Sequence, residues 1–185
     1  FSDITERKLR EAELSRLASS DTLTGLPNRA VFLQKLAQLV TEKTEHALLV
    51  FDLDNFKKIN DSLGHELGDN LLCKLADRLS NYQRYQNCLY RVGGDEFALI
   101  AEGEPEAIER LAARIIASLD ISLLDDLHEV RVGVSIGMAQ FPMHGDDRRR
   151  LVAAADTAMY RAKEAGKRRF AWPQASVSPV LAATD

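Results

Sequence analysis

Two acidic residues close a segment of the chain that is otherwise apolar. The run from His46 to Asp54 has the length and the β-branched and aromatic content of a buried strand, and it ends in Asp52-Leu53-Asp54. Because side chains alternate along a strand, both carboxylates point to the same side. A carboxylate at the end of a buried strand is costly unless a cation or a donor compensates for its lost hydration. An acid in this place also serves as a helix cap or a turn partner, so the pair alone leaves a metal site and a structural role open.

A second acidic pair, Asp95 and Glu96, follows two glycines between short apolar segments at residues 88–92 and 98–101. Two glycines between strand-like segments predict the tight turn of a β-hairpin. Acidic residues near hairpin turns are common, so this motif alone favours a structural turn. The adjacent carboxylates could instead hold a divalent cation, and the glycines would let a bulky ligand lie against the backbone.

Groups suited to a nucleotide follow the first acidic pair. A lysine, an amide, a histidine and two further acids are found at Lys57, Asn60, His65, Asp61 and Asp69. Acids can hold Mg²⁺, a lysine can contact phosphate, and an amide and a carboxylate can recognise a base. The combination indicates a magnesium–nucleotide site that the strand end and the hairpin turn would build together.

Hydrophobic periodicity predicts the elements that must position these residues. Helices are predicted over residues 28–41, 69–82, 105–119 and 151–164. Strands are predicted at residues 46–53, in a hairpin over 87–101, at 130–138 and at 168–172. A strand, a helix, a hairpin, a helix and a strand make a βαββαβ arrangement, which is an α/β fold in the form of an α+β sandwich.

The composition is that of one soluble globular domain. Of 185 residues, 45% are hydrophobic and 28% are charged, and the net charge of −4 argues against a general nucleic-acid binder. Cys73 and Cys88 lack the spacing of a metal site, which fits a reduced, cytoplasmic setting. No apolar stretch approaches the roughly 20 residues of a membrane span. Because the chain starts at Phe1, we expect a fragment, and a membrane anchor in the full-length protein stays open.

With these residues in view, the chain resembles a GGDEF domain, the catalytic unit of diguanylate cyclases. Five motifs carry the resemblance in the family's order, at residues 21–29 (DTLTGLPNR), 51–61 (FDLDNFKKIND), 64–69 (GHELGD), 91–97 (RVGGDEF) and 163–167 (KEAGK). The resemblance extends from about Asp21 to Trp172. It implies the ferredoxin-like palm core of nucleotidyl cyclases and polymerases.

The resemblance implies a metal-dependent reaction that joins two GTP molecules into cyclic di-GMP and releases two pyrophosphates. Asp52 and Asp95 would coordinate Mg²⁺, two ions per GTP site with Mn²⁺ as a substitute, and the carbonyl of Leu53 would help. Asp95 or Glu96 would accept the proton of the ribose 3′-hydroxyl. The sequence does not separate a base from a ligand, because one carboxylate can act as both.

By the same resemblance, several residues would contact the phosphates. Lys57 matches a position that stabilises the transition state, and Phe56 with its neighbours would offer backbone N–H groups. Lys163 and Lys167 would hold the β- and γ-phosphates. The family often has arginine at the position of Lys167, and lysine keeps the charge without the bidentate fork. The alternative for both lysines is an exposed basic helix end that interacts with the helix dipole.

The resemblance also assigns the recognition of guanine. Asn60 and Asp69 match the guanine-reading positions, and a carboxylate that accepts from guanine N1–H and N2–H₂ would reject adenine. His65 lies between them and is either a loop-stabilising residue or a ligand contact.

One GGDEF domain resembles half of an active site, so the resemblance implies a homodimer in which two copies face each other. The family's inhibitory Arg-x-x-Asp site stands here as Arg84-Tyr85-Gln86-Asn87, and Arg114 would be its second arginine. An amide offers one acceptor where a carboxylate accepts two guanine N–H groups. The change to asparagine predicts weakened inhibition by cyclic di-GMP.

Three regions are expected along the chain. Residues 1–20 form a charged segment with leucines at roughly helical spacing, either a solvated amphipathic helix or a signalling helix that pairs as a coiled coil. The beginning of this segment resembles the end of a PAS sensor domain. Residues 21–172 form the catalytic domain, and residues 173–185 form a disordered tail or a linker, with an EAL domain as a candidate downstream neighbour.

Two other functions compete with an active cyclase. A non-catalytic GTP-binding GGDEF module could regulate an adjacent phosphodiesterase domain, but such modules usually lose acids or glycines at the turn, and this chain retains all of them. A metal-dependent cyclase acting on another nucleotide is disfavoured by Asn60 and Asp69.

Overall fold

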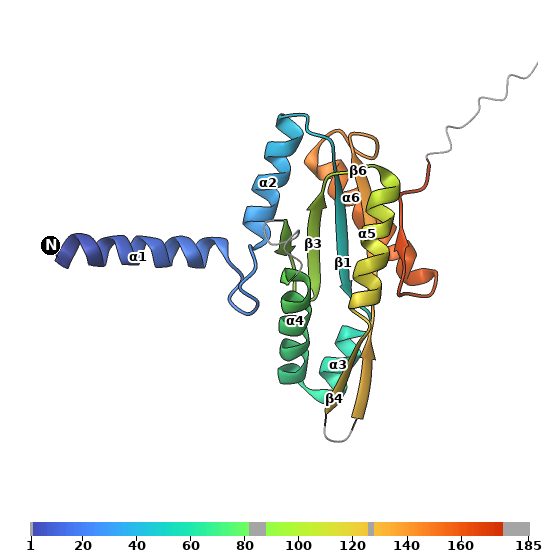
Figure 1. The fold of residues 1–185 in the computed structure, drawn as a ribbon, viewed down its shortest axis with the longest axis horizontal. Helices are drawn as coiled ribbons and strands as arrows, with labels where there is room; N and C mark the ends of the chain where they lie inside the picture. The colour runs from blue at the N-terminus through green and yellow to red at the C-terminus, as the bar shows by residue number, and fades with distance from the viewer. Residues whose placement is uncertain (1, 82–87, 126–127, 176–185) are drawn as a thin grey trace, which may run out of the picture.

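The computed structural model describes residues 2–81, 88–125 and 128–175 and folds them around a five-stranded sheet (Figure 1). The strand order is β2-β3-β1-β6-β7, and a separate sheet pairs β4 with β5. The elements are α1 (Ser2–Ser19), α2 (Arg29–Thr41), β1 (His46–Leu53), α3 (Phe56–Leu63), α4 (His65–Ser80), β2 (Leu89–Arg91), β3 (Glu96–Ala101), α5 (Pro105–Ser118), β4 (Ile121–Asp125), β5 (His128–Val132), β6 (Val134–Phe141), α6 (Arg148–Glu164) and β7 (Phe170–Ala171). The first four strands of the main sheet are connected as a βαββαβ core, which confirms the predicted α/β fold.

β1 is the central strand, and its sequence explains why. All eight of its residues are buried, as expected for an apolar run covered on both faces. It pairs antiparallel with β3 and with β6, so that Phe51 lies opposite Phe97 on one side and Ile136 on the other. β7 extends the sheet by pairing parallel to β6 after the crossover through α6.

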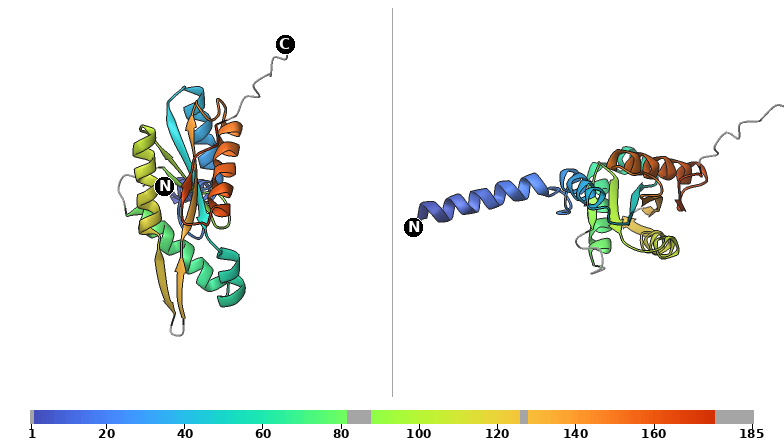
Figure 2. Two further views of the ribbon diagram at one scale, coloured as in Figure 1. Left: turned by 90° about the vertical axis from the view of Figure 1, so that its right-hand side faces the viewer. Right: turned by 90° about the horizontal axis from the view of Figure 1, so that it is seen from above.

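Helices cover both faces of this sheet, as the two views in Figure 2 show. On one face, Phe51 belongs to a core built with α4 and α5. On the other face, Val50 belongs to a core built with α2 and α6. Since alternate residues share a face, the row that contains Val50 continues into Asp52 and Asp54. The acidic pair therefore lies at the end of the core between the sheet and α6.

α6 lies unusually close to the sheet at Gly137 of β6. A Cβ atom added at this glycine would overlap the carbonyl oxygen of Ala155 and the backbone nitrogen of Met159, both in α6. Backbone atoms of a helix cannot move aside as a flexible side chain can. Only glycine fits, and this contact sets the height of α6 above the sheet.

We expect the substitution Gly137→Ala to lower the free energy of unfolding by about 2 kcal/mol, the typical cost of overpacking. The measurement is urea unfolding followed by circular dichroism. Gly94→Ala is the matched control, because a Cβ there meets nothing within 4 Å. Equal stability of the two variants would contradict the close packing described here.

The strand predicted over residues 130–138 is divided in the structure, so that prediction was wrong. β5 pairs with β4 outside the main sheet, and β6 begins after Gly133. The carbonyl of Gly133 accepts a hydrogen bond of 2.9 Å from the backbone nitrogen of Asp54, and a Cβ would lie 2.7 Å from Nε of Arg168. The chain changes sheets where no side chain fits. The strand predicted at 168–172 is only the two-residue β7.

Two helices begin earlier than the apolar periodicity indicated. α4 starts at His65, directly after Gly64 with φ of 89°, and not at Asp69. α6 starts at Arg148, and the side chain of Asp147 caps it by accepting from the backbone nitrogen of Arg150. Both helices begin with mostly polar residues, so the spacing of apolar residues did not predict their first turns.

α1 extends away from the body of the domain (Figures 1 and 2) and has no buried residue. Its large apolar side chains are exposed, at Ile4, Leu9, Leu14 and Leu17. Within the described ranges, no helix combines the length and the apolar character needed to cross a membrane.

Candidate functional site

The candidate site is built where β1 ends between β3 and β6. Asp52 lies opposite Glu96 of β3 and opposite Ser135 of β6. Directly paired residues of antiparallel strands share a face, so the carboxylates of Asp52 and Glu96 point toward α6. Asp95, at the tip of the hairpin, lies near enough to raise the pKa of both.

Lys163 of α6 contacts the carboxylate of Asp52. Its Nζ donates to Oδ2 at 2.7 Å and lies 2.7 Å from Oδ1. Burial, with Asp95 and Asp54 adding to it, raises the pKa of Asp52 to about 6, although Lys163 acts in the opposite direction. The lysine therefore offsets only part of the free-energy cost of burying this carboxylate. Among the described residues, Oδ1 has this ion-pair contact but no hydrogen bond of good geometry.

Glu96 and Asp156 form a second acidic contact in the same place. Burial, together with Asp156 and Asp52, raises the pKa of Glu96 to about 7, and burial raises the pKa of Asp156. The two carboxyl groups are hydrogen-bonded to each other. The sequence analysis missed Asp156, although it lies seven residues before Lys163 and so on the same face of α6.

Asp54 has a structural role. Its Oδ1 accepts from the hydroxyl of Ser135 at 2.6 Å, and its Oδ2 accepts from the backbone nitrogen of Arg168 at 3.1 Å. It is 4% exposed. The two acids of the Asp-x-Asp pair thus differ, because Asp54 has a separate donor for each oxygen, whereas both oxygens of Asp52 lie 2.7 Å from the single ammonium group of Lys163.

The N-terminus of α3 lies directly after this strand end. Asn55 precedes the helix in the left-handed conformation (φ 60°), and its Oδ1 accepts from Nζ of Lys167 at 2.6 Å. Phe56 and Lys57 occupy the first turn, where backbone N–H groups lack helical acceptors. Lys167 therefore contacts the residue that directly precedes Phe56 and Lys57, and the phosphate site expected from these residues stays a prediction.

The side chain of Asn60 on α3 packs against Gly68 of α4. The Oδ1 of Asn60 is buried and has no hydrogen-bond partner among the described residues. A Cβ added at Gly68 would overlap this oxygen and would lie 3.3 Å from Cζ of Phe56. Gly68 therefore leaves the space that Asn60 occupies. Asp69 and His65 are exposed on α4 beside it.

For the GTP reaction that the resemblance implies, we expect Gly68→Ala to raise the KM about tenfold, because the added methyl group displaces the amide of Asn60. The kcat should change much less, since the acids on β1 and β3 are not touched. Initial rates at varied GTP measure both constants. Asn70→Ala, at an exposed position of the same helix, is the control. A kcat loss with an unchanged KM would contradict this placement of Asn60.

The donor set at the strand end fits a divalent cation. No group of three or more His, Cys, Asp or Glu side chains in the described part of the chain is arranged to hold a metal by itself. Asp52, Asp95 and the carbonyl of Leu53 would supply hard oxygen ligands, and Mg²⁺ usually completes its shell with water and substrate phosphates. The oxygen of Asp52 that lacks a hydrogen bond of good geometry among the described residues and the mutual repulsion of the acids are both features that a cation would relieve.

Of the residues expected at the inhibitory site, the structure describes Arg114. Arg114 is exposed on α5, and it lines a cavity of about 690 Å³ together with Lys35, Tyr90 and Arg110. Arg84 and Asn87 lie outside the described residues.

Comparison with known proteins by sequence identifies the same family as the five motifs do. Residues 18–169 match the family described as "Diguanylate cyclase, GGDEF domain". The chain is 39% identical over 171 residues to the "Bifunctional diguanylate cyclase/cyclic di-GMP phosphodiesterase MucR" of Pseudomonas aeruginosa, covering 90% of the chain and 25% of that protein. It is 38% identical over 175 residues to the "Cyclic di-GMP phosphodiesterase PdeR" of Escherichia coli, covering 91% of the chain and 26% of that protein. The chain thus spans about a quarter of the length of these relatives.

Solved structures show the same fold. The crystal structure of the GGDEF domain of TpbB from Pseudomonas aeruginosa aligns with a TM-score of 0.75 and 35% identity, over 82% of this chain and 99% of that one. The coiled coil and GGDEF domain of DgcB from Caulobacter crescentus, solved with c-di-GMP, aligns with a TM-score of 0.80 and 27% identity, over 92% and 94%. With the family match across most of its length, this chain belongs to the diguanylate cyclase GGDEF domain family.

Proposed function

We propose that this domain condenses two GTP molecules into cyclic di-GMP and two pyrophosphates, with Mg²⁺, at a site completed by two copies of the chain. The observation that supports this most is the convergence of Asp52, Asp95 and Glu96 at one end of the sheet, beside the N-terminus of α3. A GGDEF module without catalysis would have no need to keep these acids together at the cost that the raised pKa values of Asp52 and Glu96 indicate.

In this mechanism each 3′-oxygen attacks the α-phosphorus of the other nucleotide. A new P–O bond forms, the bond to pyrophosphate breaks, and Asp95 or Glu96 accepts the hydroxyl proton. Lys57 and the backbone N–H groups of α3 bind the phosphates, together with Lys167. Bound Mg²⁺, held by Asp52, Asp95 and the carbonyl of Leu53, would neutralise charge on the phosphates.

Lys163 has two partners in this proposal. In the structure it is paired with Asp52. The side chain of Lys163 is 31% exposed, so its ammonium group would be able to turn toward the β- and γ-phosphates once Asp52 held Mg²⁺. Without metal and substrate, Lys163 offsets part of the cost of the buried carboxylate of Asp52.

The choice of guanine would come from Asn60 and Asp69. The buried oxygen of Asn60 needs a donor, and guanine offers N1–H and N2–H₂ where adenine has no matching donors. Leaving such an oxygen without a partner strongly disfavours the wrong base. His65 is the first residue of α4, three residues before Gly68, against which Asn60 packs.

Dimerisation would be assisted by α1. Its exposed apolar side chains and its lack of any buried residue suit pairing with a second copy, and a coiled coil adjoins the GGDEF domain in the DgcB structure. Pairing raises the effective concentration of one half-site near the other. In a full-length protein expected in the cytoplasm, a PAS-like sensor before α1 would control this pairing, and an EAL domain is the candidate neighbour after residue 185.

The experiment is incubation of the protein with GTP and Mg²⁺, followed by chromatography of the products. Cyclic di-GMP is the expected product. Recovery of bound but intact GTP would instead support a regulatory module of a phosphodiesterase, a name that PdeR carries. Turnover of ATP would contradict the guanine assignment, and replacement of Mg²⁺ by Mn²⁺ tests the choice of metal.

Feedback inhibition is expected to be weak because Asn87 replaces the acid of the inhibitory motif. The substitution Asn87→Asp should lower the concentration of cyclic di-GMP that halves the rate by about tenfold, through a second acceptor for guanine. Arg84→Ala and Arg114→Ala, each combined with Asn87→Asp, should cancel that gain. Tight inhibition of the unaltered protein at this site would contradict the prediction.

A further inference from the structure

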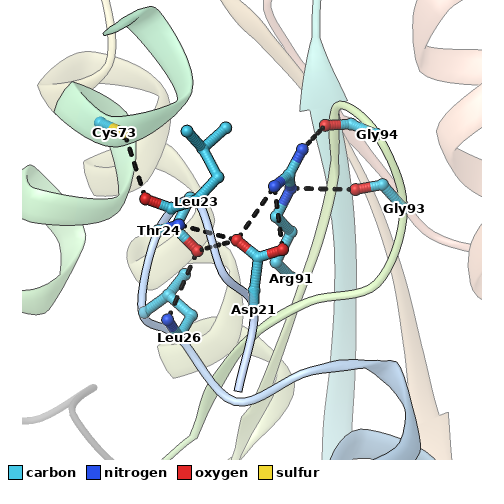
Figure 3. Close-up of polar contacts among 8 residues, drawn as sticks. All are labelled: Asp21, Leu23, Thr24, Leu26, Cys73, Arg91, Gly93 and Gly94. Carbon is cyan, nitrogen blue, oxygen red and sulfur yellow. Dashed lines mark hydrogen bonds and ion pairs between the residues drawn. The ribbon is translucent and has the colours of Figure 1, made fainter. Parts of the chain in front are cut away.

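Arg91 joins the catalytic turn to another part of the chain. Its Nε donates to the carbonyl oxygen of Gly93 at 3.2 Å, and its Nη2 donates to that of Gly94 at 2.7 Å. Its Nη1 donates to both carboxylate oxygens of Asp21, each at 2.9 Å (Figure 3). One guanidinium therefore holds the two glycine carbonyls and a carboxylate that lies 70 residues earlier in the chain.

Asp21 lies at the foot of the N-terminal helix, two residues after α1 ends. Its Oδ2 also accepts from the backbone nitrogen of Thr24 at 2.8 Å and from its hydroxyl at 2.7 Å. Burial opposes its ionisation, but the hydrogen bonds of Thr24 and Arg91 outweigh that effect and lower the pKa of Asp21. The side chains of Arg91 and Asp21 are only 14% and 19% exposed. This is not a solvated surface pair.

The backbone around the pair is also held. The backbone nitrogen of Arg91 donates to the carbonyl of Pro27 at 3.1 Å, and Ser20 forms an isolated bridge with Pro27. Nδ2 of Asn28 donates to the carbonyl of Ala18, in the last turn of α1. The end of α1 therefore has a fixed position relative to β2, from which the catalytic turn begins.

We propose that Asp21 and Arg91 are positioning residues that together hold the Gly93–Gly94 turn, and so Asp95 and Glu96, in a place set by the end of α1. We call the two residues the Asp21–Arg91 clamp. This inference rests on the proposed cyclase function for its consequence. The clamp connects the segment after α1 with the turn that carries the acids through two side chains, those of Asp21 and Arg91, and not through the sheet.

The geometry requires an arginine. Lysine has one nitrogen and cannot reach Asp21 and both carbonyl oxygens at the same time. Arg91→Lys therefore keeps the charge near Asp21 and releases the turn. Asp21→Asn keeps an oxygen that can accept from Thr24 and removes the charge that orients Arg91. Both substitutions are conservative toward the fold and disruptive toward the turn.

The test uses these two variants, the double variant and the unaltered protein. Initial rates with GTP and Mg²⁺ give kcat and KM, and hydrogen exchange followed by mass spectrometry reports on the turn. The amides of Val92 and Gly93 donate to the carbonyl of Glu96 at 2.9 and 3.2 Å, so their exchange measures whether the turn is closed. Arg150→Lys is the control, because its ion pair with Asp146 is about 70% exposed on both sides.

We expect kcat to fall about tenfold or more in each single variant, with KM changed less than threefold. The double variant should fall no further than the worse single one, since the two residues act as a unit. The amides of Val92 and Gly93 should exchange at least tenfold faster, while those of β1 stay protected. Unaltered kcat and exchange in both variants, or a general loss of protection that includes β1, would overturn the clamp. If the unaltered protein makes no cyclic di-GMP but the exchange result is obtained, the clamp holds and the proposed function fails.

Discussion

If the domain is the proposed cyclase, we expect the substitution Asp52→Asn to abolish turnover of GTP, with kcat roughly 10³-fold below that of the unaltered protein. The amide cannot replace a charged metal ligand, and Asp52 is the buried carboxylate around which the other acids gather. The measurement is the rate of cyclic di-GMP formation at saturating GTP and Mg²⁺. Asp61→Asn, an exposed acid on α3, is the control for the loss of one charge. Activity within tenfold of normal would contradict the placement of the metal site.

The same substitution should leave the protein as stable as before, or more stable. The pKa of Asp52 is raised to about 6, mainly by burial, so its ionisation at neutral pH is less favourable in the folded protein than in the unfolded chain, even with Lys163 beside it. Asparagine removes that cost and frees a lysine that can turn toward solvent. Asp54→Asn gives the contrast, because Asp54 accepts from Ser135 and from the backbone of Arg168. Its replacement weakens a satisfied network and should lower the unfolding temperature.

The sequence predicted those parts of the fold in which local chemistry and burial agree. The apolar run that contains Val50 and Phe51 has the length and composition of a buried strand, and it forms β1, whose eight residues are all buried. The paired glycines at 93–94 required a turn, and the turn is there, between β2 and β3. Asp52, Asp95 and Glu96 could be expected to converge, because each stands at the end of a strand that enters one sheet.

Other features depend on contacts that the sequence does not display. The break at Gly133 follows from the approach of Arg168, 35 residues later, so the alternation that continues across it was misleading. Asp156 lies in an alanine-rich helix, and the sequence does not show which face of this helix packs on the sheet. An acid in such a helix is therefore expected to be exposed to solvent. The bond from Arg91 to Asp21 joins two motifs of the resemblance that no local pattern connects.

The cluster of acids should make the metal-free protein lose stability as the pH rises. The pKa of Asp52 is raised from 3.8 to about 6 and that of Glu96 from 4.5 to about 7, mainly by burial. Between about pH 4 and pH 7 the folded protein therefore binds more protons than the unfolded chain. Stability then decreases as the pH increases through this window, and the penalty is complete above about pH 7. Buried His46 and half-buried His144 oppose the trend, because burial lowers the pKa of both histidines, and their neutral forms favour the fold above about pH 6.5.

Unfolding by urea in EDTA at pH 5, 6, 7 and 8 isolates the contribution of the acids when the unaltered protein is compared with the double variant Asp52→Asn, Glu96→Gln. Relative to that variant, the unaltered protein should lose on the order of 3 kcal/mol between pH 5 and pH 8. Because the histidines are present in both proteins, their effect cancels in the difference. Saturating Mg²⁺ should restore most of the loss at pH 8 in the unaltered protein and none in the variant, since a cation binds the ionised acids and competes with their protons. Parallel pH profiles for the two proteins would show that the acids do not share a buried environment, and the metal assignment would fall with that result.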